Sequence, residues 1–264
     1  MAHTPEKIYE HLRQANRLWI FLDYDGTLAD FAPTPEQVNP DPEVIDLLTR
    51  LARLPRVRVS VISGRQLSHV EKLAPVPGVI LAGTYGVELR MAEGERVERI
   101  AYNAIRPTLE AIKPRWSHLI AEREGFFLED KGWALALHAR FAADDAAETV
   151  LPAARRAAVE MASLELFRVL GGHKFLEVGP RLAHKGKTVE YLMEHCSWPS
   201  ALPLYLGDDD KDEEAFEVIK ARGGIAILVT PQARETRADY RLESPRATRQ
   251  WLEGLLRRLD NDLE

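Results

Sequence analysis

The chain has 264 residues, of which 45% are apolar and 29% are charged, the balance of an ordinary soluble globular protein. This length suits one large domain or two modest ones. The formal net charge of −6 makes polyanions such as nucleic acids poor non-specific partners, so any anionic ligand must be attracted by a local cluster of positive groups.

The single cysteine, Cys196, excludes an internal disulfide and fits a reducing compartment. The N-terminal residues 1–7 lack the apolar stretch of a signal peptide. No run of the sequence approaches the ~18 apolar residues that a membrane span needs. We therefore expect a soluble cytoplasmic protein without a membrane partner, and a monomer is compatible with the sequence.

Short apolar runs recur along the chain, and helical patterns separate them. The runs are Trp19–Leu22, Val57–Ile62, Val79–Ala82, Leu202–Leu206 and Ile225–Val229. Near-continuous apolar runs are typical of strands that are covered on both faces, as in a parallel sheet. Helix start signals follow at Asp41-Pro42 and Ser244-Pro245. This alternation predicts an α/β fold with a doubly wound, mostly parallel sheet.

The stretch from Ile105 to Ala183 breaks this alternation. Its predicted elements are, in order, a helix over 105–121, strands over 125–129 and 133–139, a helix over 144–161 and strands over 165–170 and 174–178. Such an α+β unit could stand alone on an open sheet. We therefore predict an inserted second domain over 105–183, with residues 1–104 and 184–264 together forming the sheet domain.

Two acidic segments follow predicted strands and lie almost two hundred residues apart. Asp23 and Asp25 follow the first strand, and Asp208 and Asp209 follow the fourth. In open α/β sheets, ligands bind outside the carboxyl ends of the strands, so we expect these acids to converge. Asp23, Asp208 and one main-chain carbonyl would give Mg²⁺ the hard oxygen ligands that it prefers. The predicted set of metal ligands is Asp23, Asp25, Asp208 and Asp209, with one carboxylate available as a nucleophile.

The same acids could instead be solvated turn residues or helix caps, an explanation that weakens when both segments are considered together. A calcium loop is another competitor, because Asp208, Asp210 and Asp212 alternate like the start of an EF-hand. That loop needs glycine at its sixth position and glutamate at its twelfth. Glu213 and Ile219 stand at those positions, so the calcium interpretation fails.

Three further segments suggest a site for a phosphate group. Gly26 permits a tight turn, after which the backbone amides, starting with Thr27, could surround an anion. Ser63 and Gly64 open a predicted helix, where a hydroxyl and free amides are natural phosphate ligands, although Ser63 could equally be an N-cap. Lys185 also starts a helix, where its charge opposes the helix dipole. An anion-binding role explains that placement better than a solvated lysine does.

Taken in order, these motifs resemble those of the haloacid dehalogenase-like (HAD) phosphohydrolases. The shared pattern is Asp-x-Asp-Gly-Thr, then Ser, then Lys, then Gly-Asp-Asp-x-x-Asp, and it extends across the whole sheet domain. The resemblance is closer still to the trehalose-6-phosphate phosphatases, through residues 21–28, 61–65 and 207–213. It implies a HAD-like Rossmann-type core with an inserted cap domain that selects the substrate.

The resemblance also implies the activity: magnesium-dependent hydrolysis of a sugar phosphate, most closely trehalose 6-phosphate. Asp23 would attack phosphorus and form an aspartyl-phosphate, and Asp25 would protonate the departing sugar oxygen and then activate water. Mg²⁺, Ser63 and Lys185 would neutralise charge on the transferring phosphoryl group. Asp208 would bind the metal directly.

The resemblance extends to the predicted cap, but two residues of the core differ from the usual pattern of the family. The cap residues that fall where those enzymes contact the sugar are Lys131, His138, Arg140, Lys174 and Glu177. Each could instead belong to the solvent face of a hairpin. In the core, Tyr85 stands where many such phosphatases have histidine, and Lys211 replaces the usual threonine between the last acids, which loosens the substrate assignment.

Three other functions stay open. The nearest is another capped sugar phosphatase, acting on sucrose 6-phosphate, a mannosyl- or glucosyl-3-phosphoglycerate or a hexose phosphate. A phosphomutase shares the same core but would return an isomerised sugar. A non-catalytic sugar-phosphate sensor would keep the fold without turnover, but such a protein has no use for the intact pair of Asp23 and Asp25. The fold alone does not decide between these functions.

Overall fold

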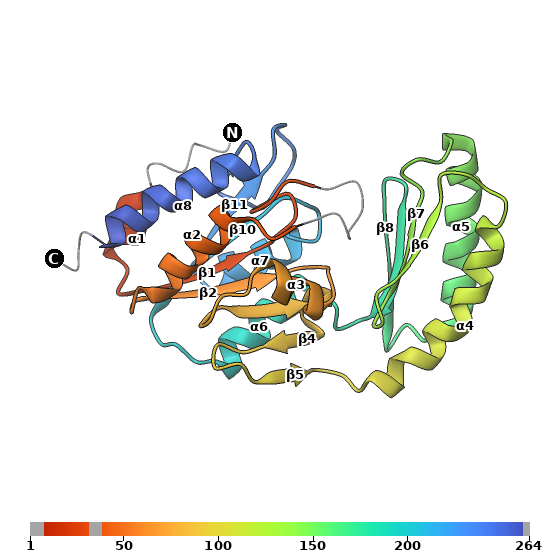
Figure 1. Cartoon of the computed structure of the whole chain (residues 1–264), viewed down its shortest axis with the longest axis horizontal. Helices are drawn as coiled ribbons and strands as arrows, with labels where there is room; N and C mark the ends of the chain where they lie inside the picture. The colour runs from red at the N-terminus through yellow and green to blue at the C-terminus, as the bar shows by residue number, and fades with distance from the viewer. Residues whose placement is uncertain (1–7, 32–38, 261–264) are drawn as a thin grey trace. The chain divides into compact units, whose positions relative to one another are not determined.

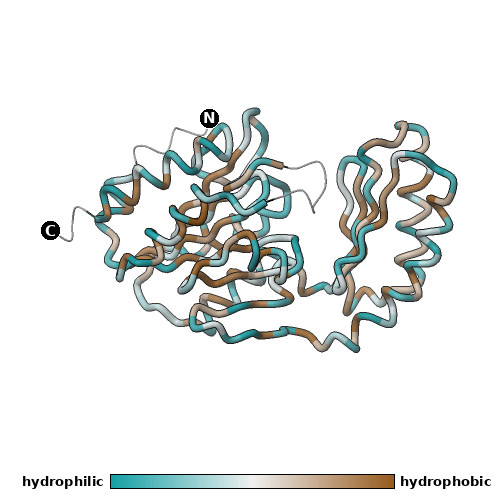
Figure 2. The backbone as a smooth tube through the Cα atoms, viewed as in Figure 1, coloured by the Kyte–Doolittle hydropathy of each residue, from teal (hydrophilic) through white to brown (hydrophobic). Residues whose placement is uncertain are grey.

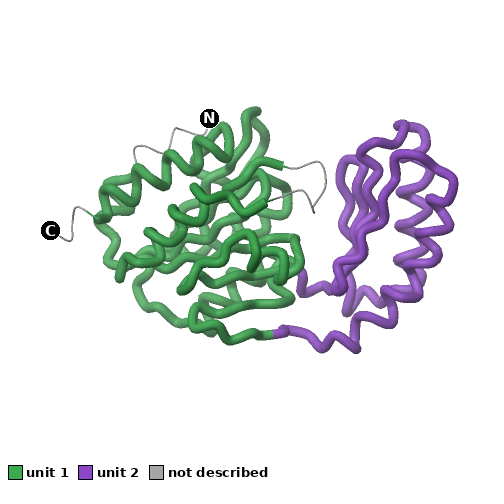
Figure 3. The backbone as a smooth tube through the Cα atoms, in the orientation of Figure 1, with its two compact units in different colours: residues 1–97, 184–264 green, residues 98–183 purple. Residues whose placement is uncertain are grey.

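The computed structural model describes residues 8–31 and 39–260, so the N-terminal residues 1–7 considered above lie outside the described part (Figure 1). The chain forms two compact units, one made of residues 1–97 and 184–264 and the other of residues 98–183 (Figure 3). Within the two described stretches, no helix has the length and apolar character that crossing a membrane requires.

The first unit contains an eight-stranded sheet with the order β12-β11-β10-β1-β2-β3-β4-β5. Its strands are β1 (Arg17–Leu22), β2 (Val57–Ile62), β3 (Ile80–Gly83), β4 (Glu88–Arg90), β5 (Arg96–Glu98), β10 (Ala201–Gly207), β11 (Ile225–Val229) and β12 (Tyr240–Leu242). The pairings from β12 to β3 are parallel, and β4 runs antiparallel to β3. Figure 2 shows the central strands of this sheet as largely hydrophobic.

Helices cover both faces of this sheet. Successive side chains of a strand point to opposite faces, so the central strands contribute to two separate hydrophobic cores. The helices of the unit are α1 (Tyr9–Gln14), α2 (Pro42–Arg53), α3 (Leu67–Leu73), α6 (Lys185–His195), α7 (Glu213–Ala221) and α8 (Pro245–Asp260). Ile20 and Leu22 pack with apolar residues of α1, α2, α3 and α8, whereas Trp19 and Phe21 pack with those of α6 and α7. The predicted doubly wound, mostly parallel α/β fold is confirmed.

The start signals read from the sequence act as helix caps. The side chain of Asp41 accepts a hydrogen bond from the Glu43 amide at 2.9 Å, and Pro42 opens α2. The Ser244 hydroxyl accepts one from the Ala247 amide at 3.2 Å at the start of α8. Both serve amides that have no partner within the helix.

The second unit pairs a four-stranded antiparallel sheet, of order β6-β7-β9-β8, with two helices. Its elements are α4 (Tyr102–Ile120), β6 (Phe127–Asp130), β7 (Leu135–His138), α5 (Asp144–Met161), β8 (Phe167–Gly172) and β9 (Phe175–Pro180). The Trp116 indole of α4 donates a hydrogen bond to the Ala154 carbonyl of α5 at 2.9 Å. The predicted domain start at Ile105 lies inside α4, because residues 102–104 are exposed and add nothing to the apolar pattern.

Candidate active site

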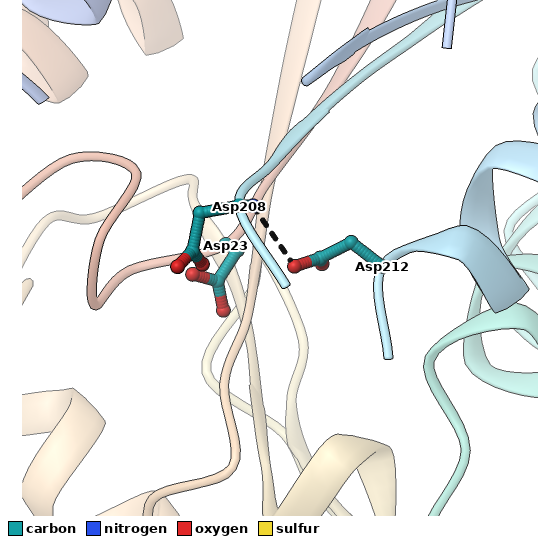
Figure 4. Close-up of side chains that lie close together, drawn as sticks. All are labelled: Asp23, Asp208 and Asp212. Atoms are coloured by element: carbon teal, nitrogen blue, oxygen red, sulfur yellow. Dashed lines mark hydrogen bonds between the residues drawn. The ribbon is translucent and has the colours of Figure 1, made fainter. Parts of the chain in front are cut away.

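The parallel register of β1 and β10 brings the two acidic segments together. Leu22 pairs with Leu206, and the Asp23 amide donates a hydrogen bond to the Leu206 carbonyl at 3.0 Å. Asp23 and Asp208 therefore leave the sheet side by side (Figure 4). One carboxylate oxygen from each of Asp23, Asp208 and Asp212 lies within 4.8 Å of the other two. The convergence inferred from the strand ends is present in the structure.

Lys185 supplies the buried positive charge of this site. It begins α6, has 2% of its surface exposed, and donates hydrogen bonds through Nζ to Asp23 Oδ1 at 2.7 Å and to Asp212 Oδ1 at 2.6 Å. Burial alone would lower the pKa of Lys185, but the carboxylates of Asp212 and Asp23 raise it well above its usual value. The ammonium group therefore stays charged while it holds Asp23 in place.

Asp212 anchors the loop that follows β10. Its Oδ1 accepts a hydrogen bond from the Tyr205 hydroxyl at 2.7 Å as well as that from Lys185, and its Oδ2 accepts the amides of Asp208 and Asp209 at 3.1 Å each. The carboxylate is fully buried, and both of its oxygens have donors. We infer that Asp212 orients the loop and Lys185, and that it is less available to a metal than Asp208.

Asp208 is a partly buried carboxyl group with three other carboxylates nearby. Burial raises the pKa of Asp208 to about 9, with further contributions from Asp23, Asp212 and Asp209. Burial also raises the pKa of Asp23, against the opposing effect of Lys185. A divalent cation beside Asp23 and Asp208 would stabilise both ionised carboxylates, because an opposite charge favours the charged form. The donor set thus fits a hard cation such as Mg²⁺.

Gly26 allows this close approach. Its φ is +80°, and a Cβ atom at this position would lie 2.3 Å from Asp208 Oδ2. The glycine expected to permit a turn is therefore required for a second reason, because its missing side chain leaves room for the Asp208 carboxylate. Thr27, the next residue, is fully buried, and its hydroxyl has no hydrogen-bond partner within residues 8–31 and 39–260.

The side chains of Asp25 and Asp209, two of the four predicted metal ligands, have other partners. Arg65 binds Asp25 through two hydrogen bonds of 2.7 and 2.8 Å. Asp209 Oδ1 accepts the amides of Lys211 and Asp212 at 2.9 and 3.2 Å. Burial would raise the pKa of Asp209, but Lys185 and Lys211 bring it down to about 2. Both acids therefore lie next to the three-carboxylate group without belonging to it.

Ser63 lies at the carboxyl end of β2 and is 1% exposed. Its hydroxyl accepts the Arg65 amide at 3.2 Å, which is the local bond of a turn, and its carbonyl accepts the Tyr85 amide at 2.8 Å. The ring of Tyr85 lies so close to Gly64 that a Cβ there would be 2.6 Å from it. The alternative to phosphate binding was an N-cap, but α3 begins at Leu67 with Gln66 as its N-cap. Ser63 lies instead in the turn after β2, at the same sheet edge as Asp23.

Two side chains that bond acids of the site, Arg65 and Tyr205, are not evident from the sequence. Arg65 stands in the motif that begins with Ser63, but nothing in the sequence connects it to Asp25. Tyr205 lies inside the apolar run of β10, where a tyrosine fits the strand pattern and its hydroxyl gives no signal. Both belong to hydrogen bonds with acids of the site.

In the second unit, a polar cluster occupies one face of the sheet. Lys131 donates a hydrogen bond to Glu177 at 2.7 Å, and these residues are 9% and 2% exposed. His138 and Glu129 lie 2.9 Å apart through Nε2 and Oε2. Glu129 and Glu177 both pair in register with Ala136, so their side chains share a face. Three of the five predicted cap residues, Lys131, His138 and Glu177, come together here.

The other two predicted cap residues lie elsewhere. Lys174 has a φ of +53°, and its Nζ bonds the Ala142 carbonyl at 2.7 Å and Asp144 at 2.6 Å, at the start of α5. Arg140 is exposed, with its guanidinium 6.0 Å from the centre of the Phe141 ring. The sequence pattern could not separate these residues from the cluster, because all five alternate with apolar positions on short strands or their ends.

The first unit has a largely parallel sheet with acidic loops after β1 and β10, and a buried lysine is bonded to Asp23. The second unit is an inserted α+β domain. This combination is that of the HAD-like phosphatases with a cap domain. The family model described as trehalose-phosphatase matches residues 21–246. The chain belongs to the trehalose-phosphatase family.

One curated protein and two solved structures show what the chain is similar to in sequence and in fold. The chain is 36% identical over 250 residues to a trehalose-phosphate phosphatase of Mycobacterium avium (strain 104), covering 91% of this chain and 62% of that protein. It therefore spans less than two thirds of that relative. Among solved structures, the C-terminal domain of Candida albicans trehalose-6-phosphate phosphatase superposes with a TM-score of 0.84 at 23% identity, covering 97% and 98% of the two chains. The Aspergillus fumigatus trehalose-6-phosphate phosphatase gives 0.70 at 25% identity and the same coverage.

Proposed function

We propose that this protein is a cytoplasmic, magnesium-dependent phosphatase that hydrolyses trehalose 6-phosphate to trehalose and phosphate through an aspartyl-phosphate. One observation carries the proposal: the buried Asp23 carboxylate is held by Lys185 through one oxygen and has an oxygen within 4.8 Å of one from Asp208. A carboxylate fixed in this way can act as a nucleophile. The family and its relatives support the choice of trehalose 6-phosphate as substrate.

In the first step, an oxygen of Asp23 forms a bond to phosphorus while the bond from phosphorus to the sugar oxygen breaks. Lys185 keeps the nucleophile oriented and contributes a fixed positive charge near the transferring phosphoryl group. Fixed charges of this kind need no reorganisation during the reaction and act strongly in a site with little water. Ser63, Gly64 and the amides after Gly26 complete the proposed phosphate site.

Asp25 is proposed to give a proton to the departing sugar oxygen and then to accept one from the water that cleaves the aspartyl-phosphate. In the structure it is bound to Arg65 by two hydrogen bonds. Asp25 therefore has to leave Arg65 before it can reach a leaving group. The second step releases inorganic phosphate and restores the Asp23 carboxylate.

Mg²⁺ bound by Asp23, Asp208 and a main-chain carbonyl would supply positive charge to the phosphoryl group. Of the four acids predicted as ligands, Asp23 and Asp208 have carboxylate oxygens close to each other. Both also have a raised pKa, which a bound cation would lower. Asp209 and Asp25 are assigned to supporting contacts. Asp209 already accepts hydrogen bonds from turn amides, and Asp25 already accepts them from Arg65.

Selection of the sugar is assigned to the second unit. The paired side chains of Lys131 with Glu177 and of His138 with Glu129 present charged donors and acceptors on one sheet face. Sugar hydroxyls need such groups in fixed positions, since a buried polar group left without a partner reduces affinity. Arg140 and Lys174, which lie outside this cluster, are left out of the proposed sugar site.

The test is phosphate release with Mg²⁺ from trehalose 6-phosphate, sucrose 6-phosphate, glucosyl-3-phosphoglycerate and glucose 6-phosphate. We expect trehalose 6-phosphate to give the highest kcat/KM, EDTA to stop turnover and the Asp23→Asn variant to release no phosphate while its circular dichroism is unchanged. Phosphate release by Asp23→Asn would refute the assignment of Asp23 as the nucleophile. A preference for another ester, or return of an isomerised sugar phosphate, would establish a rival sugar phosphatase or a phosphomutase.

A further inference from the structure

The sheet edge of the first unit carries more negative than positive side chains. Its five acids are Asp23, Asp25, Asp208, Asp209 and Asp212, and the cations paired with them are Lys185, Arg65 and Lys211. Fully ionised, the set has a charge of −2, which one divalent cation would balance. Each cation of the set therefore affects how strongly the site attracts a metal or repels an anion.

Lys211 is the cation of this set to which the proposed mechanism gives no role. Its side chain is 23% exposed, and its Nζ lies 3.8 Å from Asp209 Oδ2. Lys185 Nζ lies 3.9 Å from the other oxygen, Asp209 Oδ1. Two ammonium groups thus flank one carboxylate, one from the buried side of the site and one from its more exposed side.

Tyr85 fixes the position of Lys211. The Lys211 ammonium lies 5.2 Å from the centre of the Tyr85 ring, within the range of a cation–π contact. Tyr85 is 5% exposed, its backbone has a φ of +55°, and its carbonyl accepts the Thr188 hydroxyl at 2.7 Å. Because the ring also lies against Gly64, it has little room to move.

We propose that Lys211 is a positioning residue that sets the charge balance of the site: from its place between Asp209 and Tyr85 it weakens divalent-cation binding and strengthens binding of the phosphoryl group. The inference rests on the proposed function, because both ligands belong to it. Its physical content is that one fixed positive charge acts with opposite sign on a cation and on an anion.

This reasoning predicts opposite shifts when Lys211 is neutralised. In Lys211→Met we expect Mg²⁺ to bind about three- to tenfold more tightly and inorganic phosphate to bind about three- to tenfold more weakly, the size of effect that a partly screened unit charge produces nearby. If Lys211 had a purely structural role, the substitution would weaken the binding of Mg²⁺ and of phosphate together. Lys211→Arg keeps the charge, so both affinities should stay within about twofold of the wild type.

The experiment is isothermal titration calorimetry of the full chain, first with Mg²⁺ alone and then with inorganic phosphate at saturating Mg²⁺. Lys220→Met is the matched control, because Lys220 is an exposed lysine of α7 paired with Asp239. Shifts of opposite sign in Lys211→Met alone support the proposal. Unchanged affinities, or a loss of both, overturn it while the wild type still binds Mg²⁺, whereas a wild type that binds no Mg²⁺ would overturn the proposed function as well.

Discussion

Lys185→Met should destabilise the protein strongly, apart from any effect on turnover. Its Nζ contacts Asp23 at 2.7 Å and Asp212 at 2.6 Å, and the three side chains are 3%, 7% and 0% exposed. Removing one partner of a buried ion pair typically costs about 3–5 kcal/mol, because the remaining charge stays buried without compensation. We expect a loss of this size in the free energy of unfolding near neutral pH.

The loss should also depend on pH. Burial raises the pKa values of Asp23 and Asp212 in the folded protein, and removal of the ammonium would raise them further. A carboxyl group whose pKa is raised by folding, from about 3.9 in the unfolded chain, destabilises the fold at high pH, and this penalty declines as the pH falls through the folded-state pKa. The difference in unfolding free energy between wild type and variant should therefore narrow as the pH falls from neutral through the raised folded-state pKa values of these two acids.

Urea unfolding followed by circular dichroism at several pH values measures this difference by linear extrapolation. Lys220→Met serves again as the control, because exposed ion pairs contribute about 1 kcal/mol or less. A Lys185→Met variant that loses less than about 1 kcal/mol, or loses the same amount at every pH, would contradict the assignment of Lys185 as the compensating charge of two buried carboxylates.

Three other substitutions test separate parts of the structure. Gly207→Ala places a Cβ 2.2 Å from Asp212 Cγ, so it should cost about 1–3 kcal/mol of stability and reduce kcat. Normal turnover by this variant would contradict the role of Asp212 as the anchor of the loop after β10. Asp130→Asn removes the negative charge and one of the two oxygens that accept hydrogen bonds from Arg106, which is the main cause of the lowered pKa of Asp130, and urea unfolding should show a loss of about 1–2 kcal/mol at neutral pH. Stability from a lowered carboxyl pKa is complete above the unfolded value of about 3.9 and declines as the pH falls from there through the lower folded-state pKa of Asp130, so a difference that does not decline below about pH 4 would refute the ion pair. Glu177→Gln should lower kcat/KM for trehalose 6-phosphate about tenfold or more but hardly change that for p-nitrophenyl phosphate, whereas equal losses would remove it from the sugar site.

Strand patterns predicted the part of the fold that positions the site. The apolar runs marked the central strands, and the rule that ligands bind at the carboxyl ends of parallel strands placed Asp23 beside Asp208. The strands at the two ends of the sheet, β4 and β5 on one side and β12 on the other, were not predicted, because they have three residues each and lack an apolar run. Short edge strands are held by their neighbours in the sheet, which a local pattern does not contain.

Side-chain pairing across long stretches of sequence was the part that could not be predicted. Arg65 and Asp25 are 40 residues apart, and Lys185 and Asp23 are 162 apart. Lys185 was nevertheless identified, because a lysine at a helix start is electrostatically unfavourable and so needs an explanation. Arg65 gave no such signal, since an arginine near a helix start also has an ordinary place in solvent.

The run Asp208, Asp209 and Asp210 shows why residue type alone does not assign chemistry. Burial and like charges raise the pKa of Asp208 to about 9, whereas two lysines and turn amides bring that of Asp209 to about 2. Asp210 has a side chain that is 95% exposed and pairs with Arg234 at 2.8 Å. The sequence presents three equivalent acids, and the loop that Asp212 anchors gives each a different environment. Asp208 is the one of the three whose ionised form a cation would stabilise, so binding of the metal in the proposed mechanism is expected to depend on Asp212, the anchor, as much as on the direct ligands.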